Sequence, residues 1–237
     1  MRLKREQLKL IRGRHLGYRI TLAYELSMLL LLPVAQRWPP LLSLLLIGQA
    51  AVLMLFVSRF SALRATRPLM YAMGGLAITL ELLWQVAMHW SPLLVRQLTL
   101  PHVVVWVAFL LLTVVRKVKS LIREPYVTMS VVMGAAAGYL TVGIAGGVLL
   151  TALWVLQPSA FMASALPPVA GAGVASAAIA PSLMTASFGL LTTVGTAVLN
   201  PSNINVQVIA NVITISGQLY VAILIALILG RVQKRLS

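Results

Sequence analysis

The stretch 187–196 reads Ser-Phe-Gly-Leu-Leu-Thr-Thr-Val-Gly-Thr and lies between two long apolar segments. It predicts a short helix that runs into an extended Thr-Val-Gly segment, in which Gly195 relieves the strain of unusual backbone dihedral angles. The backbone carbonyls of Thr193, Val194 and Gly195, repeated around a symmetric ring, can replace the water around a cation. Everything else that the sequence predicts depends on what surrounds this stretch.

The composition of the chain is that of a membrane protein. Its 237 residues are 60% hydrophobic and only 10% charged, which leaves too little polar cover for a solvated surface. The net charge of +15 comes from basic residues that fall between apolar segments, so membrane topology explains it better than nucleic-acid binding does. The absence of Cys excludes disulfides and thiolate metal sites.

Six apolar runs are each about long enough to cross a bilayer as a helix. They predict an all-α integral membrane protein with six transmembrane helices. Four of these helices form an N-terminal module, 1–115, and two form a C-terminal domain, 127–237. A basic cytoplasmic linker, 116–126, joins them and is expected to lie along the membrane surface. The six runs are 18–35, 41–58, 69–89, 98–115, 127–156 and 204–230.

Basic residues gather on one side of these six spans. All of the 19 Lys and Arg residues except Arg37 and Arg96 fall in the N-terminus, the loop 59–67, the linker or the C-terminus. Cytoplasmic segments carry such an excess, so both termini are expected to be cytoplasmic. The fourth span, 98–115, contains no Lys or Arg, so conventional voltage sensing is not expected.

The connection 157–203 carries no charge and is expected to fold back into protein at membrane depth, as a re-entrant segment. A pore helix is expected from Pro181, whose missing N–H suits a first helical turn. Ser182, Thr185, Ser187 and Thr192 are expected to give this helix polar contacts toward the backbone that follows it. Ordinary helix packing is an equal alternative for Ser182 and Thr185.

The C-terminal domain resembles prokaryotic members of the two-transmembrane-pore ion channel family, the pore module shared by potassium channels. The resemblance covers about 127–230, nearly half of the chain. It rests on several matches in the right order. They are Thr128, Gly134-Ala135, Tyr139-Leu140 and Gly143 in the outer helix, Leu-Gln-Pro-Ser-Ala-Phe at 156–161, Ser187-Phe188 and Leu191-Thr192-Thr193-Val194-Gly195 in the pore helix and filter, and Gly-Gln-Leu-Tyr-Val-Ala-Ile-Leu-Ile-Ala at 217–226.

The resemblance implies a passive cation channel of the cell inner (plasma) membrane. Thr193, Val194, Gly195 and Thr196 would coordinate a monovalent cation, potassium before others, and no cofactor or other metal is expected. One chain carries one pore loop, so a closed ring requires about four copies, a homotetramer. Gly217 is expected either to act as a hinge of the inner helix or to allow close helix packing.

The chain departs from the family after its Thr-Val-Gly. The family pattern continues Tyr-Gly-Asp, where this sequence has Thr196, Ala197 and Val198. These changes remove an aromatic residue behind the filter, a second glycine, and an anion at the outer mouth. Three outcomes therefore stay open: a potassium-selective pore, a less selective cation pore, and a non-conducting channel-like subunit or scaffold with a degenerate filter.

Two acidic residues, Glu25 and Glu81, fall inside predicted spans. They are interpreted first as partners of basic residues, and second as proton sites of a secondary transporter, against which the lack of an inverted repeat argues. His89 and His102 flank the predicted outer turn, but two histidines without a third ligand make a weak metal site. The chain has no Asp and no convincing Ser–His pair, so an enzyme is not expected.

Overall fold

The computed structural model describes residues 5–60, 67–122, 124, 128–167 and 174–236, and this part of the chain is all-helical. Seven α-helices and two short 3-10 helices follow one another. They are α1 (Arg5–Arg37), α2 (Pro40–Phe60), α3 (Arg67–Trp90), α4 (Pro92–Ile122), α5 (Met129–Leu156), η2 (Pro158–Ala160), η3 (Ala163–Ala165), α6 (Val174–Leu191) and α7 (Ile204–Leu236).

Five helices in the described ranges are long and apolar enough to cross a membrane, so the chain has the features of a multi-pass α-helical membrane protein. The five belong to α1, α3, α4, α5 and α7. In α2, which corresponds to the second expected span, 41–58, the described apolar part is shorter, Pro40–Phe56. Each apolar run of the sequence has become one helix, because an unpaired backbone is too costly away from water.

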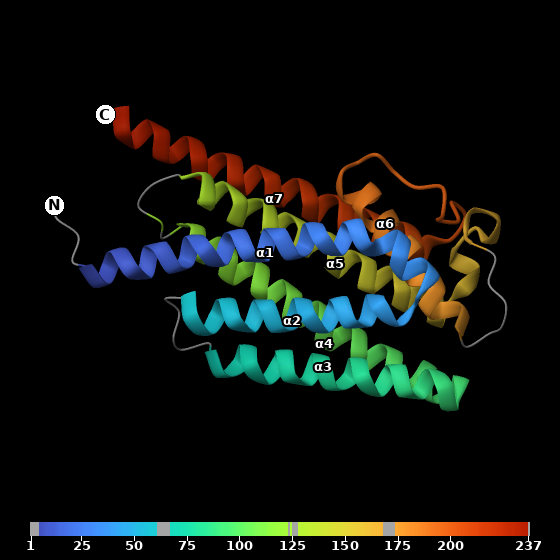
Figure 1. The fold of residues 1–237 in the computed structure, drawn as a ribbon. Helices are drawn as coiled ribbons and strands as arrows, with labels where there is room; N and C mark the ends of the chain where they lie inside the picture. Colours follow the sequence, from blue (N-terminus) through green and yellow to red (C-terminus); the bar gives the residue numbers. More distant parts are fainter. Residues whose placement is uncertain (1–4, 61–66, 123, 125–127, 168–173, 237) are drawn as a thin grey trace.

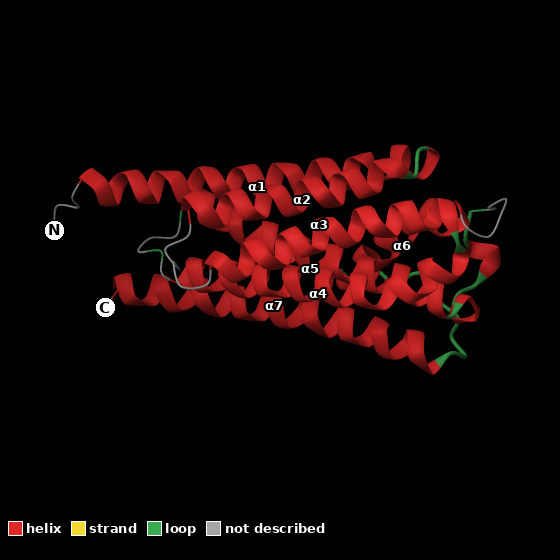
Figure 2. Cartoon of the chain, turned by 90° about the horizontal axis from the view of Figure 1, so that it is seen from below, coloured by secondary structure: helices red, strands yellow, loops and turns green. Residues whose placement is uncertain are grey.

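The helices run side by side along one long axis, and α1 begins at the same end of the bundle at which α7 ends (Figure 1, Figure 2). One core cluster contains side chains from all of α1 to α6, among them Tyr18, Met28, Trp106, Ile144 and Met184. The helices of the predicted N-terminal module therefore pack directly against α5 and α6 and share their core.

Two helix boundaries differ from those expected. The basic segment that begins at Arg116 was expected to form a separate surface helix, but it continues α4 as far as Ile122. Good helix formers allow this continuation, and Lys117 at its start is buried in the bundle. The pore helix was expected to begin at Pro181, but α6 begins at Val174 and contains Pro181. The Ala-rich residues before Pro181 favour helix, and they offset the one hydrogen bond that a proline removes.

Candidate functional site

The helix α6 ends about halfway along the two long helices beside it. Its C-terminal turn is tied to α5, where the Tyr139 hydroxyl donates to the Leu191 carbonyl at 2.9 Å, and to α7, where the Thr214 hydroxyl donates to the Leu190 carbonyl at 3.1 Å. After α6 the chain returns to the end of the bundle at which α5 ends and α7 begins (Figure 1). The segment predicted as a filter therefore starts in the middle of the bundle.

Glycines of α5 allow α6 to approach this closely. A methyl group added at Gly143 would overlap the ring of Phe188, and one added at Gly147 would overlap the side chain of Met184. The Ser187 hydroxyl also donates to the Gly143 carbonyl at 2.8 Å. The small residues of α5 thus let side chains of α6 pack directly against the α5 backbone, as is common between membrane helices.

The predicted filter follows α6 directly and is exposed. Thr193 and Gly195 have φ angles of 62° and 84°, in the left-handed region, and Val194 is 83% exposed. The Gly195 N–H donates to the Gly189 carbonyl and the Thr193 N–H donates to the Leu190 carbonyl, both at 3.0 Å. The extended conformation that the sequence predicted is interrupted at Thr193, because these bonds fold the segment back onto the last turn of α6.

Three of the hydroxyls assigned to the pore helix make contacts other than those expected. Thr185 and Ser187 lie within α6, while Thr192 follows its end. Thr185 donates to the Pro181 carbonyl at 3.0 Å, Thr192 to the Phe188 carbonyl at 2.8 Å, and Ser187 to α5. All three of these bonds go to carbonyls of α5 or α6, and the expected contacts toward the filter backbone stay a prediction.

The residues after the filter are anchored to the 3-10 turns that follow α5. The Met162 N–H donates to the Val198 carbonyl at 2.8 Å, and the Asn200 N–H donates to the Ala160 carbonyl at 3.0 Å. Thr196 is half-buried, and its hydroxyl accepts the Val198 N–H at 3.3 Å. Both ends of the segment 192–199 are thus held, one by α6 and one by the turn near Ala160.

The helix α7 has three distinct faces and is the most exposed of the five candidate spans. Its buried face packs against α5 and α6. A second, apolar face is exposed and includes Val208, Val212, Ile215 and Leu219. The third face carries Gln207, Asn211, Thr214 and Gln218.

The four residues of this third face, here called the polar stripe, follow one another at spacings of four, three and four residues, which place them on one side of a helix. Gln207, Asn211 and Gln218 are exposed, and Thr214 is half-buried. The sequence analysis did not select these residues. Polar side chains at helical spacing within an apolar span were the signal that would have found them.

Gly217 lies on the buried face of α7, against the end of α6. A methyl group there would stand 2.7 Å from the Leu191 side chain and 2.8 Å from the Leu191 carbonyl oxygen. This contact supports the close-packing interpretation of Gly217. Its role as a hinge stays a prediction.

Glu25 is fully buried at the centre of the bundle, where one carboxylate oxygen collects donors from three other helices. Its Oε1 lies 2.8 Å from Gln49 Nε2 on α2, 3.1 Å from Lys117 Nζ on α4 and 2.7 Å from the Thr141 hydroxyl on α5. Lys117 is 1% exposed, so this is a buried ion pair. The preferred interpretation of Glu25, a partner for a basic residue, agrees with these contacts.

Glu81 is also buried and pairs with a basic side chain. Its Oε2 lies 2.7 Å from His102 Nε2, and the His102 ring stacks on Trp84 with their planes 4° apart. No group of three or more potential metal ligands is found among the described residues, and the side chain of His89 lies outside them. Neither acid lies beside the segment 193–196.

Comparisons with known proteins add nothing to this geometry: no family model, no curated protein and no solved structure matches the chain.

Proposed function

We propose that four copies of this chain form a channel for monovalent cations. Six helices cross the cell inner (plasma) membrane with both termini in the cytoplasm, α6 serves as a re-entrant pore helix, and α7 lines the pore. Thr193, Val194, Gly195 and Thr196 coordinate the ion, and potassium is the expected permeant species.

The observation that carries the proposal is the exposed polar stripe on α7. An amide side chain that faces lipid has lost its hydrogen bonds to water, at a cost of roughly 1–3 kcal/mol each. Gln207 donates to the Pro201 carbonyl at 2.8 Å, and the exposed amides of Asn211 and Gln218 follow it on the same face of a mostly apolar span, so that face is better matched to a water-filled cavity than to lipid. A symmetric assembly around α7 would supply the cavity.

The position of the filter segment agrees with this arrangement. Thr214, which belongs to the polar stripe, bonds to the last turn of α6, so the stripe passes beside the point at which the segment 193–196 begins. Val194 is 83% exposed in the single chain. A ring of four copies would bring four such segments to one axis, with their carbonyls available to a desolvated cation.

The pore differs chemically from one built around charged side chains. The polar stripe consists of amides and a hydroxyl, and the filter segment carries no charge. Ion attraction then depends on backbone carbonyls and side-chain dipoles, which favour a monovalent cation over a divalent one that needs formal negative charge.

The test is uptake of radioactive rubidium into liposomes that hold the purified protein, with sodium or potassium as competitor. Uptake that potassium suppresses and sodium does not would support a potassium-selective pore. Suppression by both ions would support a weakly selective cation pore. Native mass spectrometry of the same preparation should give about 102 kDa for four chains of 25.6 kDa. A well-folded tetramer without uptake, or a monomer, would overturn the proposal and favour a non-conducting scaffold.

A further inference from the structure

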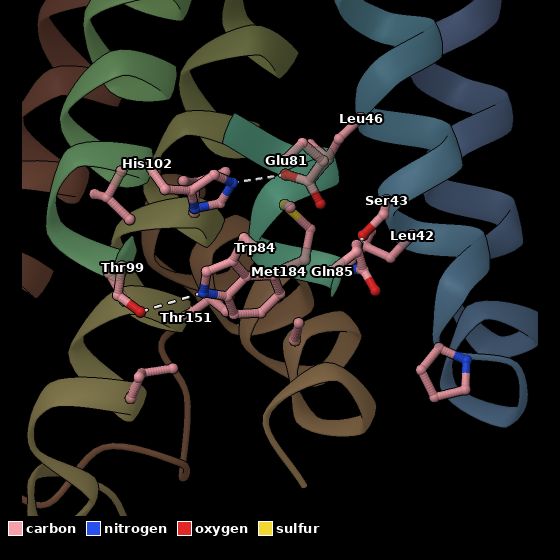
Figure 3. A pocket seen from close by; sticks show the side chains of 16 residues that line it. Leu42, Ser43, Leu46, Glu81, Trp84, Gln85, Thr99, His102, Thr151 and Met184 are labelled. Atoms are coloured by element: carbon pink, nitrogen blue, oxygen red, sulfur yellow. Dashed lines mark hydrogen bonds and ion pairs between the residues drawn. The ribbon is translucent and has the colours of Figure 1, made fainter. Parts of the chain in front are cut away.

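A pocket lies behind α6, on the side of the bundle away from α7. Side chains of five helices line it, and Figure 3 shows it from close by. Its cavity has a volume of about 40 Å³, the space of one or two water molecules, and its lining includes the apolar residues Pro39, Leu42 and Val155.

The pocket is mostly apolar, with a few polar groups that converge. Among the described side chains that line it, Glu81 and His102 are the two that carry an ionisable group. The Gln85 amide donates to the Ser43 hydroxyl, and the Trp84 indole N–H donates to the Thr99 hydroxyl at 3.2 Å. An apolar wall with a small number of oriented polar groups is the usual composition of a site for a small organic molecule.

One polar atom in this pocket stands without a protein partner. Glu81 is 1% exposed, and its Oε2 is bonded to His102, while its Oε1 makes no hydrogen bond in the described part of the chain. Figure 3 shows the first oxygen directed at His102 and the other directed away from it, on the side where Ser43 and Gln85 lie. Unlike Glu25 Oε2 and Gln49 Oε1, which are fully buried without a partner, this oxygen is open to the cavity, so a donor that enters the cavity can bond to it.

We infer that this pocket binds a primary ammonium group carried on an apolar body. The ammonium group has about the size of a water molecule and three N–H donors, so it fits the cavity and supplies the donor that Glu81 Oε1 lacks. If His102 is neutral and its Nε2–H donates to Glu81, the pair carries one negative charge, which favours a cation over a neutral alcohol. The apolar body packs against apolar lining residues such as Leu42 and Val155.

The occupant would also touch the pore helix. Ala180 and Met184 of α6 line the pocket opposite the helices that hold Glu81 and His102. The inference does not depend on ion conduction, since binding is measured in the absence of any ion gradient. Failure of the binding experiment and failure of the channel proposal are therefore separate results.

The test compares three four-carbon molecules by calorimetric titration into the protein in bilayer nanodiscs of neutral phospholipid, with protein-free nanodiscs as the background. Butylammonium should bind, butanol should bind at least about 10-fold more weakly, and butyrate should not bind. This series uses the unaltered protein, so no variant has to fold for it to be decisive. Equal binding of butylammonium and butanol, or no binding of either, would overturn the inference.

Two variants locate the site. Glu81→Gln keeps the size of the side chain and an acceptor for His102 but removes the charge, so it should abolish the preference for butylammonium over butanol. Glu124→Gln removes the same charge from an acid that pairs with Arg14, outside this pocket, and should leave the preference unchanged. A preference that persists in Glu81→Gln would place the ammonium group elsewhere and sink the assignment.

Discussion

Gly195 is the residue at which the backbone of the predicted filter demands a particular amino acid. Its φ of 84° lies in the left-handed region, and a methyl group added there would meet open space. Substitution at this position therefore acts through backbone strain and not through a clash in the single chain. Thr193, at φ 62°, adopts the same region with a side chain, and its hydroxyl lies 2.6 Å from the Thr192 carbonyl.

Gly195→Ala should lose roughly 1 kcal/mol of stability, because an L-residue pays a penalty at positive φ, and it should reduce or alter rubidium uptake. Thermal unfolding in detergent and the liposome assay measure the two effects. The matched control is Gly75→Ala on α3, where the added methyl group also meets open space but the backbone is helical. That control should gain about 0.5–1 kcal/mol and leave uptake unchanged. Wild-type uptake and selectivity in Gly195→Ala would remove Gly195 from the filter.

At the scale of elements, one face of α7 serves packing within the chain and another serves the proposed pore. One face packs on α5 and α6, a second is apolar and exposed, and the polar stripe lies between them. An apolar exposed face suits lipid or a neighbouring chain, whereas exposed amides suit water. The three faces of α7 therefore suit three different surroundings.

Asn211→Leu should cut rubidium uptake severalfold while leaving the unfolding temperature within a few degrees, because it replaces a water-facing amide with an apolar side chain in the proposed cavity. The control is Val212→Leu, one residue further on and 51% exposed on the apolar face, which should change neither quantity. If Asn211 faced lipid instead, its replacement by Leu would stabilise the protein and leave uptake intact. Parallel unfolding and uptake measurements on the two variants distinguish these outcomes.

At the scale of the whole molecule, one buried network joins the N-terminal helices to α5. Glu25 on α1, Gln49 on α2, Lys117 on α4 and Thr141 on α5 meet within hydrogen-bond distance of one carboxylate oxygen. An uncompensated charge left at this place would be far more costly than removal of the whole pair. The network therefore helps to specify how α1, α2 and α4 pack against α5.

Lys117→Met should destabilise the protein by about 3–5 kcal/mol, because it leaves the Glu25 carboxylate buried without its counter-charge. The double variant Glu25→Gln with Lys117→Met should recover most of that loss, since neither member of the pair then carries a charge. Thermal unfolding of the two single variants and the double variant gives the coupling energy directly. Additive losses would contradict the assignment of a coupled pair.

Several features were predictable because they depend on local pattern alone. Long apolar runs predicted each long helix, since backbone groups away from water must bond within their own segment. The Thr-Val-Gly run predicted an extended segment whose glycine relieves unusual dihedral angles. Gly195 does have a positive φ, but the extended conformation is interrupted at Thr193, whose φ is 62°. The start of α6 was missed, because seven helix-forming residues before Pro181 outweighed a proline signal that usually marks a first turn.

The features of the candidate sites could not be predicted from local pattern, because they depend on contacts between residues far apart in the sequence. In the sequence, Lys117 belongs to a run of basic residues that suggests an exposed segment. The structure buries it, with its Nζ 3.1 Å from Glu25 Oε1 on α1. The stripe on α7 is visible as spacing in the sequence, yet its meaning depends on which face the neighbours cover. The pocket around Glu81 combines residues of five helices, and no local pattern brings Ser43, His102 and Met184 together.

By itself, therefore, the sequence determined that this chain is helical, apolar and built around an uncharged connection that contains Thr-Val-Gly, because hydropathy and backbone preference are properties of neighbouring residues. Only the tertiary structure decided that α6 stops halfway along α5 and α7, and that two buried acids meet Lys117 and His102. The same holds for the amide face of α7, which the structure leaves exposed. Such outcomes depend on which surfaces exclude water from one another, and that choice is made by residues far apart along the chain.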